Sequence, residues 1–170
     1  MKWINHQIVT GFVVYAATDN ALFVASSIVG AVIPDRVEGD PPKDNAAYWQ
    51  WRRRHRTWSH YPILYLALIG LLLLAKEYCQ SIGLNFVTTT PFIDVIIFAL
   101  IGALLHIVED SICGKVPVFT PHSKHGIKLF EVGSWKEYFF SAIIILICLT
   151  LRLDNLDEII TLLSTEFIKR

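Results

Sequence analysis

Side chains that bind divalent metal ions gather where the apolar stretches of this sequence meet its polar loops. His106 and Asp110 end one apolar stretch, and Asp35 follows another. His55 and His60 come just before a third. Neutral imidazole and carboxylate groups suit a divalent cation such as zinc. His106 and Asp110 are four residues apart, so on a helix they share one face. The sequence therefore predicts a metal site at one end of a set of apolar elements.

The composition indicates the setting of that site. Of 170 residues, 54% are hydrophobic and 18% charged, against about 45–50% and about 25% in an ordinary soluble domain. This favours a membrane protein, and the length suits one domain. The formal net charge of zero argues against a basic nucleic-acid binder. The three cysteines are dispersed, which indicates buried small side chains rather than disulfides or a cysteine zinc site.

Three apolar stretches, 61–75, 92–108 and 138–151, predict membrane helices once their flanks are included, because a span needs about 20 residues. A soluble bundle with buried helices is the alternative. It is disfavoured because the chain has too little amphipathic helix to surround three apolar ones. Residues 153–170 are predicted to form a separate amphipathic helix after a membrane-embedded domain of residues 1–152.

The N-terminal apolar region is interrupted by Thr18, Asp19 and Asn20, which favour a turn. We expect a hairpin of two short helices, about 5–17 and 21–33, rather than one spanning helix or a cleavable signal peptide. Each arm is about 20 Å long, short of the roughly 30 Å core of a bilayer. The tip would lie in the bilayer or be covered by protein. The hairpin would return the chain to its starting side, where His6 approaches Asp35.

With the hairpin, all but four of the 15 Lys and Arg residues fall on one side of the membrane, which the positive-inside rule makes cytoplasmic. The run Arg52–Arg54 with Arg56 lies among tryptophans. We interpret this run as a topology signal and a contact for anionic lipid headgroups rather than for nucleic acid. We therefore expect a multi-pass protein of the bacterial inner membrane.

Three strings resemble the bacterial membrane-bound metal-dependent hydrolases of the YdjM-like family. The strings are Ile33-Pro34-Asp35, His55-Arg56-Thr57-Trp58-Ser59-His60 and His106-Ile107-Val108-Glu109-Asp110. They are similar to the family's LPD-x-D, HRG-x-THS and H-x-x-x-D motifs, and His6 matches an early His. A later Gly-Val-to-Pro run (Gly114, Val116, Pro121) and Glu137 follow weaker family patterns.

This resemblance implies a helical membrane domain with a hydrolase-type metal site, whose expected ligands are His6, Asp35, His55, His60, His106 and Asp110. Val37 occupies the second Asp position of LPD-x-D, and Asp40 is the acid expected to substitute for it. Thr57 and Tyr61 replace a Gly and a Ser of the HRG-x-THS frame.

The donors also support a chemical hypothesis by themselves. A catalytic zinc uses about three protein ligands, and two-metal phosphoesterase sites use more. Six donors suffice for one complete or two sparse sites. Glu109 and Asp40 are candidate general bases or partners of the histidines, and Arg56 with Arg54 could hold a phosphate. His122 and His125 are expected to be solvated, and Cys113 to be packed.

We therefore expect an all-α polytopic membrane bundle with an N-terminal hairpin, three further membrane helices and a C-terminal amphipathic helix. The expected function is zinc-dependent hydrolysis of a phosphoester or lipid-like substrate at the cytoplasmic face. A non-catalytic protein with a structural or vestigial metal is the alternative. A metal transporter is the third candidate. A transporter would need metal ligands near the middle of the membrane, and only Asp19 could lie there.

Overall fold

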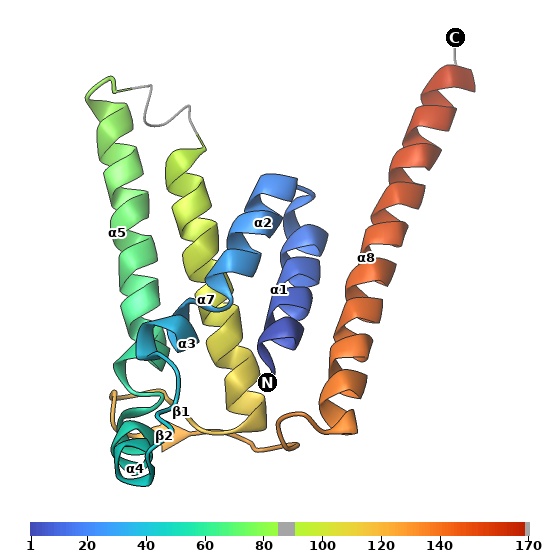
Figure 1. Cartoon of the computed structure of the whole chain (residues 1–170). Helices are drawn as coiled ribbons and strands as arrows, with labels where there is room; N and C mark the ends of the chain where they lie inside the picture. The colour runs from blue at the N-terminus through green and yellow to red at the C-terminus, as the bar shows by residue number, and fades with distance from the viewer. Residues whose placement is uncertain (85–90, 169–170) are drawn as a thin grey trace.

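The computed structural model describes residues 1–84 and 91–168, with side chains of that helical tail described only as far as residue 153. The described chain is mostly helical, as expected (Figure 1). Its helices are α1 (Trp3–Thr18), α2 (Ala21–Gly30), α3 (Ile33–Glu38), α4 (Asn45–Arg54), η1 (Trp58–His60), α5 (Pro62–Ser81), α7 (Phe92–Cys113) and α8 (Trp135–Ile168). Two short antiparallel strands, β1 (Val116–Pro117) and β2 (Lys124–His125), join the loop after α7.

The break at Thr18–Asn20 makes the expected hairpin. Asp19 adopts the left-handed conformation (φ 51°) that ends many helices, and its N–H bonds the Tyr15 carbonyl. The Asn20 side chain then accepts hydrogen bonds from the N–H groups of Leu22 and Phe23, which caps α2. Helices α1 and α2 pack against each other, so the alternative of one long spanning helix is wrong.

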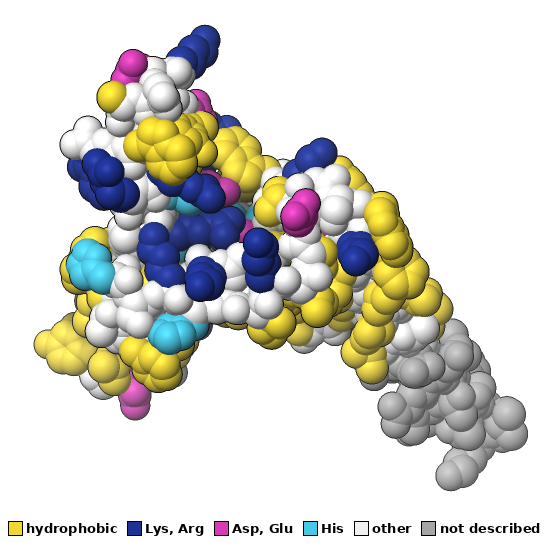
Figure 2. Space-filling view, turned by 90° about the horizontal axis from the view of Figure 1, so that it is seen from below, with side chains coloured by type: hydrophobic (Ala, Val, Ile, Leu, Met, Phe, Trp, Pro, Cys, Tyr) yellow, Lys and Arg dark blue, Asp and Glu magenta, His cyan; other side chains and the backbone are white. Residues whose placement is uncertain are grey.

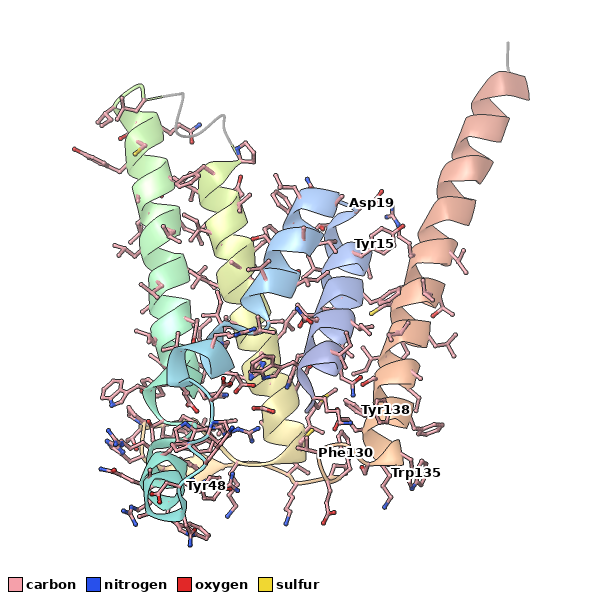
Figure 3. All side chains as sticks on the ribbon, in the orientation of Figure 1. Tyr15, Asp19, Tyr48, Phe130, Trp135 and Tyr138 are labelled. Atoms are coloured by element: carbon pink, nitrogen blue, oxygen red, sulfur yellow. The ribbon has the colours of Figure 1, made fainter. Side chains whose placement is uncertain are left out.

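The tip of the hairpin is contacted by α8. Arg152 forms an ion pair with Asp19 and lies over the Tyr15 ring, 5.5 Å from its centroid. Tyr15 and Asp19 both lie at the end of α1 that forms the tip of the hairpin (Figure 3). Helix α8 therefore contacts the tip, while the Asp19 side chain stays 53% exposed.

Two glycines bring α2 and α7 into backbone contact. A Cβ atom on Gly30 would lie 1.9 Å from the Ala99 carbonyl oxygen, and one on Gly102 would lie 2.1 Å from that of Ser27. Phe23 stacks on Phe98 beside this contact, with ring centroids 4.2 Å apart. Small residues that allow close backbone approach are typical of helix packing in membranes. This contact fixes the position of Ala31, which follows Gly30, against α7.

Two described helical segments, Asn45–Ser81 and Phe92–Cys113, are long and apolar enough to cross a membrane. Only 11% of the most apolar 18-residue stretch within Asn45–Ser81 is buried inside the protein. Helix α5, which carries the apolar part of this segment, exposes many leucines, such as Leu66, Leu71 and Leu74. It is therefore not the buried core helix that the soluble-bundle alternative requires.

Helix α8 contains the third expected membrane stretch, 138–151, but it runs without a break to Ile168. The separate helix expected at 153–170 is therefore, as far as Ile168, a continuation of α8. No Gly or Pro occurs within Trp135–Ile168, so nothing in the backbone ends the helix. The proposed apolar face of 154–170 falls on side chains outside those described.

The basic loops lie at one end of the molecule. Helix α4, the two strands and the start of α1 lie at this end, and the end of α5 and the start of α7 lie at the other (Figure 1). Seen from below, this end carries many Lys and Arg side chains (Figure 2). The structure thus groups the basic residues that the hairpin prediction placed on one side.

The glycine contact gives a first prediction. Gly102→Ala should destabilise the protein by about 1–3 kcal/mol, because the new methyl group must displace the backbone of α2. Thermal unfolding in detergent, followed by circular dichroism, measures the effect. Gly70→Ala is the matched control, since a Cβ there meets nothing within 4 Å. Equal melting temperatures for the two variants would refute the packing role of Gly102.

Candidate metal centre

Four of the six expected ligands come together in the structure. They are Asp35 from α3, His60 from η1, and His106 with Asp110 from α7, and one donor atom of each lies within 4.8 Å of all the others. His60, His106 and Asp110 are fully buried. Helix α7 presents its two ligands on one face, as their spacing predicted, while α3 and η1 complete the group from the polar end.

Five of the six distances between the donor atoms are close to those of a tetrahedral zinc site, and the sixth, between Asp35 and Asp110, is within 4.8 Å. The Nε2 atoms of His60 and His106 are 3.3 Å apart, and Asp110 Oδ2 is 3.5 Å from each. Asp35 Oδ1 is 3.4 Å from His60 Nε2 and 3.7 Å from His106 Nε2. A zinc ion about 2.0–2.1 Å from each ligand gives a tetrahedron with edges of about 3.3–3.4 Å. One ion at the centre of the group could therefore reach all four donors with small adjustments.

Hydrogen bonds at the far side of each ring aim both imidazoles at this centre. His106 Nδ1 lies 2.6 Å from the Ala31 carbonyl oxygen, which can only accept, so the Nδ1 atom carries the proton. His60 Nδ1 lies 3.1 Å from Glu38 Oε1. Such outer partners leave the Nε2 lone pair free and orient it toward a metal. Two lone pairs and two carboxylates that face one another favour a cation between them. The residues therefore fit a divalent ion.

Glu38 is the important residue that sequence reasoning missed. Its carboxylate also contacts His55 Nδ1 and the Ser59 hydroxyl, and accepts from the Arg56 N–H at 2.6 Å. Burial raises the pKa of Glu38, but the bonds from His55, His60 and Ser59 outweigh it and hold the pKa well below its usual range. The available signal was position: Glu38 lies three residues after Asp35, on the same face of α3.

Asp35 is the expected ligand that is partly exposed to solvent. Its side chain is 17% exposed, and Trp3 Nε1 donates to its second oxygen at 2.7 Å. Burial raises the pKa of Asp35, yet hydrogen bonds from His106 and His60 prevail and hold the pKa well below its usual range. Asp35 also lines a cavity of about 140 Å³, together with Trp3, Glu38, Gly39, Asp40, Pro41, Trp51 and His55. A small molecule could therefore approach the centre from the Asp35 side.

Asp110 is held by cations on both oxygens. Arg56 Nη2 lies 2.6 Å from Oδ2, the oxygen that faces the histidines. The amino group of Met1 lies 2.7 Å from Oδ1. His6 Nε2 is 3.4 Å from the same Oδ1 atom. The guanidinium group of Arg56 is thus next to the metal centre, where the sequence placed a phosphate-binding role for it.

His6 and His55 lie beside the four-residue group rather than within it. His6 packs on the His106 ring with centroids 3.9 Å apart, and its Nδ1 atom is 2.6 Å from Glu109 Oε2. His55 stacks on Trp51 and directs Nδ1 at Glu38. The hairpin therefore brings His6 to the site as expected. Both histidines are placed to support the ligands, and Glu109 is placed to orient His6.

The remaining candidates lie farther out. Asp40 is exposed at the 140 Å³ cavity and does not belong to the four-residue group, so it does not replace the ligand that is missing at Val37. Glu137 is buried and accepts from Lys2 N at 2.8 Å and Gly133 N at 2.6 Å, which anchors the start of α1. His122 and His125 are exposed and Cys113 is buried, as expected. Arg54, which the sequence paired with Arg56 for phosphate binding, is exposed.

Comparison of the chain with family models, with curated proteins and with solved structures finds no match. The resemblance to the YdjM-like family therefore stays a prediction, and the case for function depends on the geometry of the site.

The position of Glu38 gives a second prediction. Glu38→Gln should weaken zinc affinity about 10–100-fold, because His60 loses the carboxylate that orients it. Titration against a fluorescent chelator measures the affinity. Asp40→Asn is the control for loss of charge and should have little effect. Val37→Asp should also leave the affinity unchanged, since the Val37 side chain is 72% exposed. A stronger site in Val37→Asp would contradict the outward placement of Val37, and an unchanged affinity in Glu38→Gln would contradict the role given to Glu38.

Proposed function

We propose that this protein is an integral membrane metal-dependent hydrolase that acts on a phosphoester or lipid-like substrate at the cytoplasmic membrane face. The observation that carries the proposal is the group of Asp35, His60, His106 and Asp110, three of them buried, whose donor atoms all lie within 4.8 Å of one another, at distances close to those of a zinc tetrahedron for five of the six pairs. A divalent ion, with zinc as the expected one, would supply a Lewis acid and would lower the pKa of a coordinated water.

The surrounding side chains provide the other requirements of such a reaction. Arg56 is held beside Asp110 and offers a planar, permanently charged group that suits a phosphate oxygen. The cavity at Asp35 gives the substrate a route to the centre, and Asp40 at its edge could accept a proton from an attacking water. Glu38 keeps His60 and His55 in place while the substrate binds.

Membrane insertion explains the outer surface of the helices. Helices α5 and α7, with 20 and 22 residues, are about 30 Å long, the thickness of a bilayer core. The exposed leucines of α5 would face lipid rather than water. The basic loops would lie in the cytoplasm by the positive-inside rule. The metal centre, near the same end of α7, would then lie at the level of the lipid headgroups of a bacterial inner membrane.

A structural metal is the second candidate function, and one observation favours it. Four protein donors fill a tetrahedron, whereas catalytic zinc sites usually keep one position open. Against this, Asp35 lies at a cavity, and a carboxylate at an open edge can move aside for a substrate. Metal content and turnover together separate the two functions.

The third prediction concerns metal content. Purified protein should contain at least about one zinc-like ion per chain, and His106→Ala or Asp110→Ala should remove most of it, because the remaining donors cannot complete the shell. Elemental analysis and circular dichroism measure metal and folding. His122→Ala, an exposed histidine, is the matched control.

Turnover of phosphoester and phospholipid panels, with and without added metal, then tests catalysis. Full occupancy with no turnover across these panels would favour the structural metal. Wild-type protein without bound metal would refute both the hydrolase and the structural metal.

The fourth prediction concerns topology. Reporter fusions after Arg54 and after Leu84 should report opposite compartments, with Arg54 cytoplasmic, because α5 lies between them. The same compartment for both fusions would refute a membrane-spanning α5. A fusion after Lys43, before α4, is the control and should agree with Arg54.

A further inference from the structure

A second feature, a basic hollow, lies next to the metal centre. It has a volume of about 460 Å³, in the range of small-molecule sites. Its strongly basic lining residues come from the end of α4 and the loops around the two strands. They are Arg52, Arg56, Lys115, Lys124 and Lys128, and no carboxylate belongs to the lining. Figure 2 shows Lys and Arg side chains around a hollow on this face.

Most of these positive charges have no acidic partner. In the part of the chain that the structure describes, Arg56 pairs with Asp110, but no ion pair involves the other four basic residues of the hollow. Lys124 instead donates to the His55 carbonyl at 2.6 Å. Burial lowers the pKa of Lys124, and the nearby charges of Arg56 and Arg52 lower it further against the opposite effect of Glu38. The hollow therefore concentrates positive charge.

Arg56 connects the hollow to the metal centre. Its Nη2 atom contacts Asp110, and its backbone N–H is held by Glu38. Its Nε atom is buried and has no hydrogen-bond partner. Gly114 leaves room for the guanidinium, because a Cβ there would lie 2.7 Å from Arg56 Nη1. The hollow and the metal centre are therefore neighbours that share one cation.

Membrane topology alone does not require this arrangement. The positive-inside rule needs Lys and Arg on one side, and exposed residues such as Arg36, Lys43 and Arg53 already serve it. Gathering cations around one concave surface costs electrostatic repulsion, which a bound anion would offset. Several lysines and an arginine fork together suit a phosphate, with its multiple charges and acceptor oxygens.

We propose that the basic hollow binds a phosphate group distinct from the one attacked at the metal centre. The substrate would then belong to the phosphoesters that carry a second phosphate, either a soluble diphosphate or a lipid with a phosphate-bearing headgroup. That this phosphate is part of a substrate rests on the proposed function. The binding of phosphate itself does not, because it needs neither metal nor turnover.

The test uses the full chain in uncharged detergent, with metal removed by a chelator that is then dialysed away. Isothermal titration calorimetry measures the binding of inorganic pyrophosphate. We expect saturable binding that weakens as salt is added. The double variant Lys115→Gln/Lys124→Gln should bind at least about ten-fold more weakly, because it loses two charge-assisted hydrogen-bond donors. Lys43→Gln/Arg53→Gln changes the charge equally on the same side, outside the hollow, and should bind as wild type does.

A second arm distinguishes the sources of the phosphate. The wild-type protein and the two double variants are reconstituted in phosphatidylcholine nanodiscs with and without phosphatidic acid. Pyrophosphate binding is then measured again by calorimetry. If the hollow takes a lipid headgroup, phosphatidic acid should reduce pyrophosphate binding by wild-type protein. If it takes a soluble phosphate, phosphatidic acid should leave that binding unchanged.

Equal pyrophosphate affinity in the two double variants, or no binding in either arm, would overturn the proposal. Circular dichroism shows whether each variant is folded. Pyrophosphate bound in the hollow by a protein without metal or turnover would leave this inference standing while the proposed function fails.

Discussion

The hydrogen bond between His106 Nδ1 and the Ala31 carbonyl is the interaction on which the site depends. It exists because Gly30 and Gly102 let α2 and α7 meet backbone to backbone. A larger side chain at either glycine would move the carbonyl away from the ring. The same packing sets where α3 begins, and hence where Asp35 lies relative to α7. A contact typical of membrane helices thus determines the geometry of a polar centre.

Around that contact, the outer partners of the ligands form one connected network. Glu38 links His55, His60, Ser59 and the Arg56 backbone, while Arg56 links Glu38 to Asp110. Trp3 and His6 bring α1 into the same network through Asp35 and Asp110. Each carboxylate is oriented by more than one donor, so the ligand positions are fixed before a metal binds. Such preorganisation lowers the cost of binding an ion.

The distribution of charge and apolar surface is consistent with a site at a membrane interface. The apolar stretch of α5 is largely uncovered, and the polar residues of the centre lie at the end of α7 where the basic loops gather. The basic hollow opens on that end and shares Arg56 with the centre. A substrate with an apolar part and a phosphate could bind there with each part in a suitable environment, as the proposed function requires.

The sequence by itself determined the features that depend on local chemistry. Asp19 and Asn20 predict the hairpin because their side chains favour the turn and the cap, and the i, i+4 spacing places His106 and Asp110 on one face. Residue type and position at the ends of apolar stretches selected Asp35 and His60, but they also selected His55, which lies outside the group. The continuation of α8 past residue 152 was missed because polar residues there resemble a boundary, although none of them breaks a helix.

Only the tertiary structure separated ligands from their partners. Whether a histidine points at the centre or at a carboxylate depends on how α2, α3 and η1 pack on α7. That packing placed His6 and His55 beside the group, gave Glu38 its role and brought Arg52 and Arg56 to the lysines of a distant segment around one hollow. Local periodicity carries no information about such distances, since each joins residues far apart in the chain.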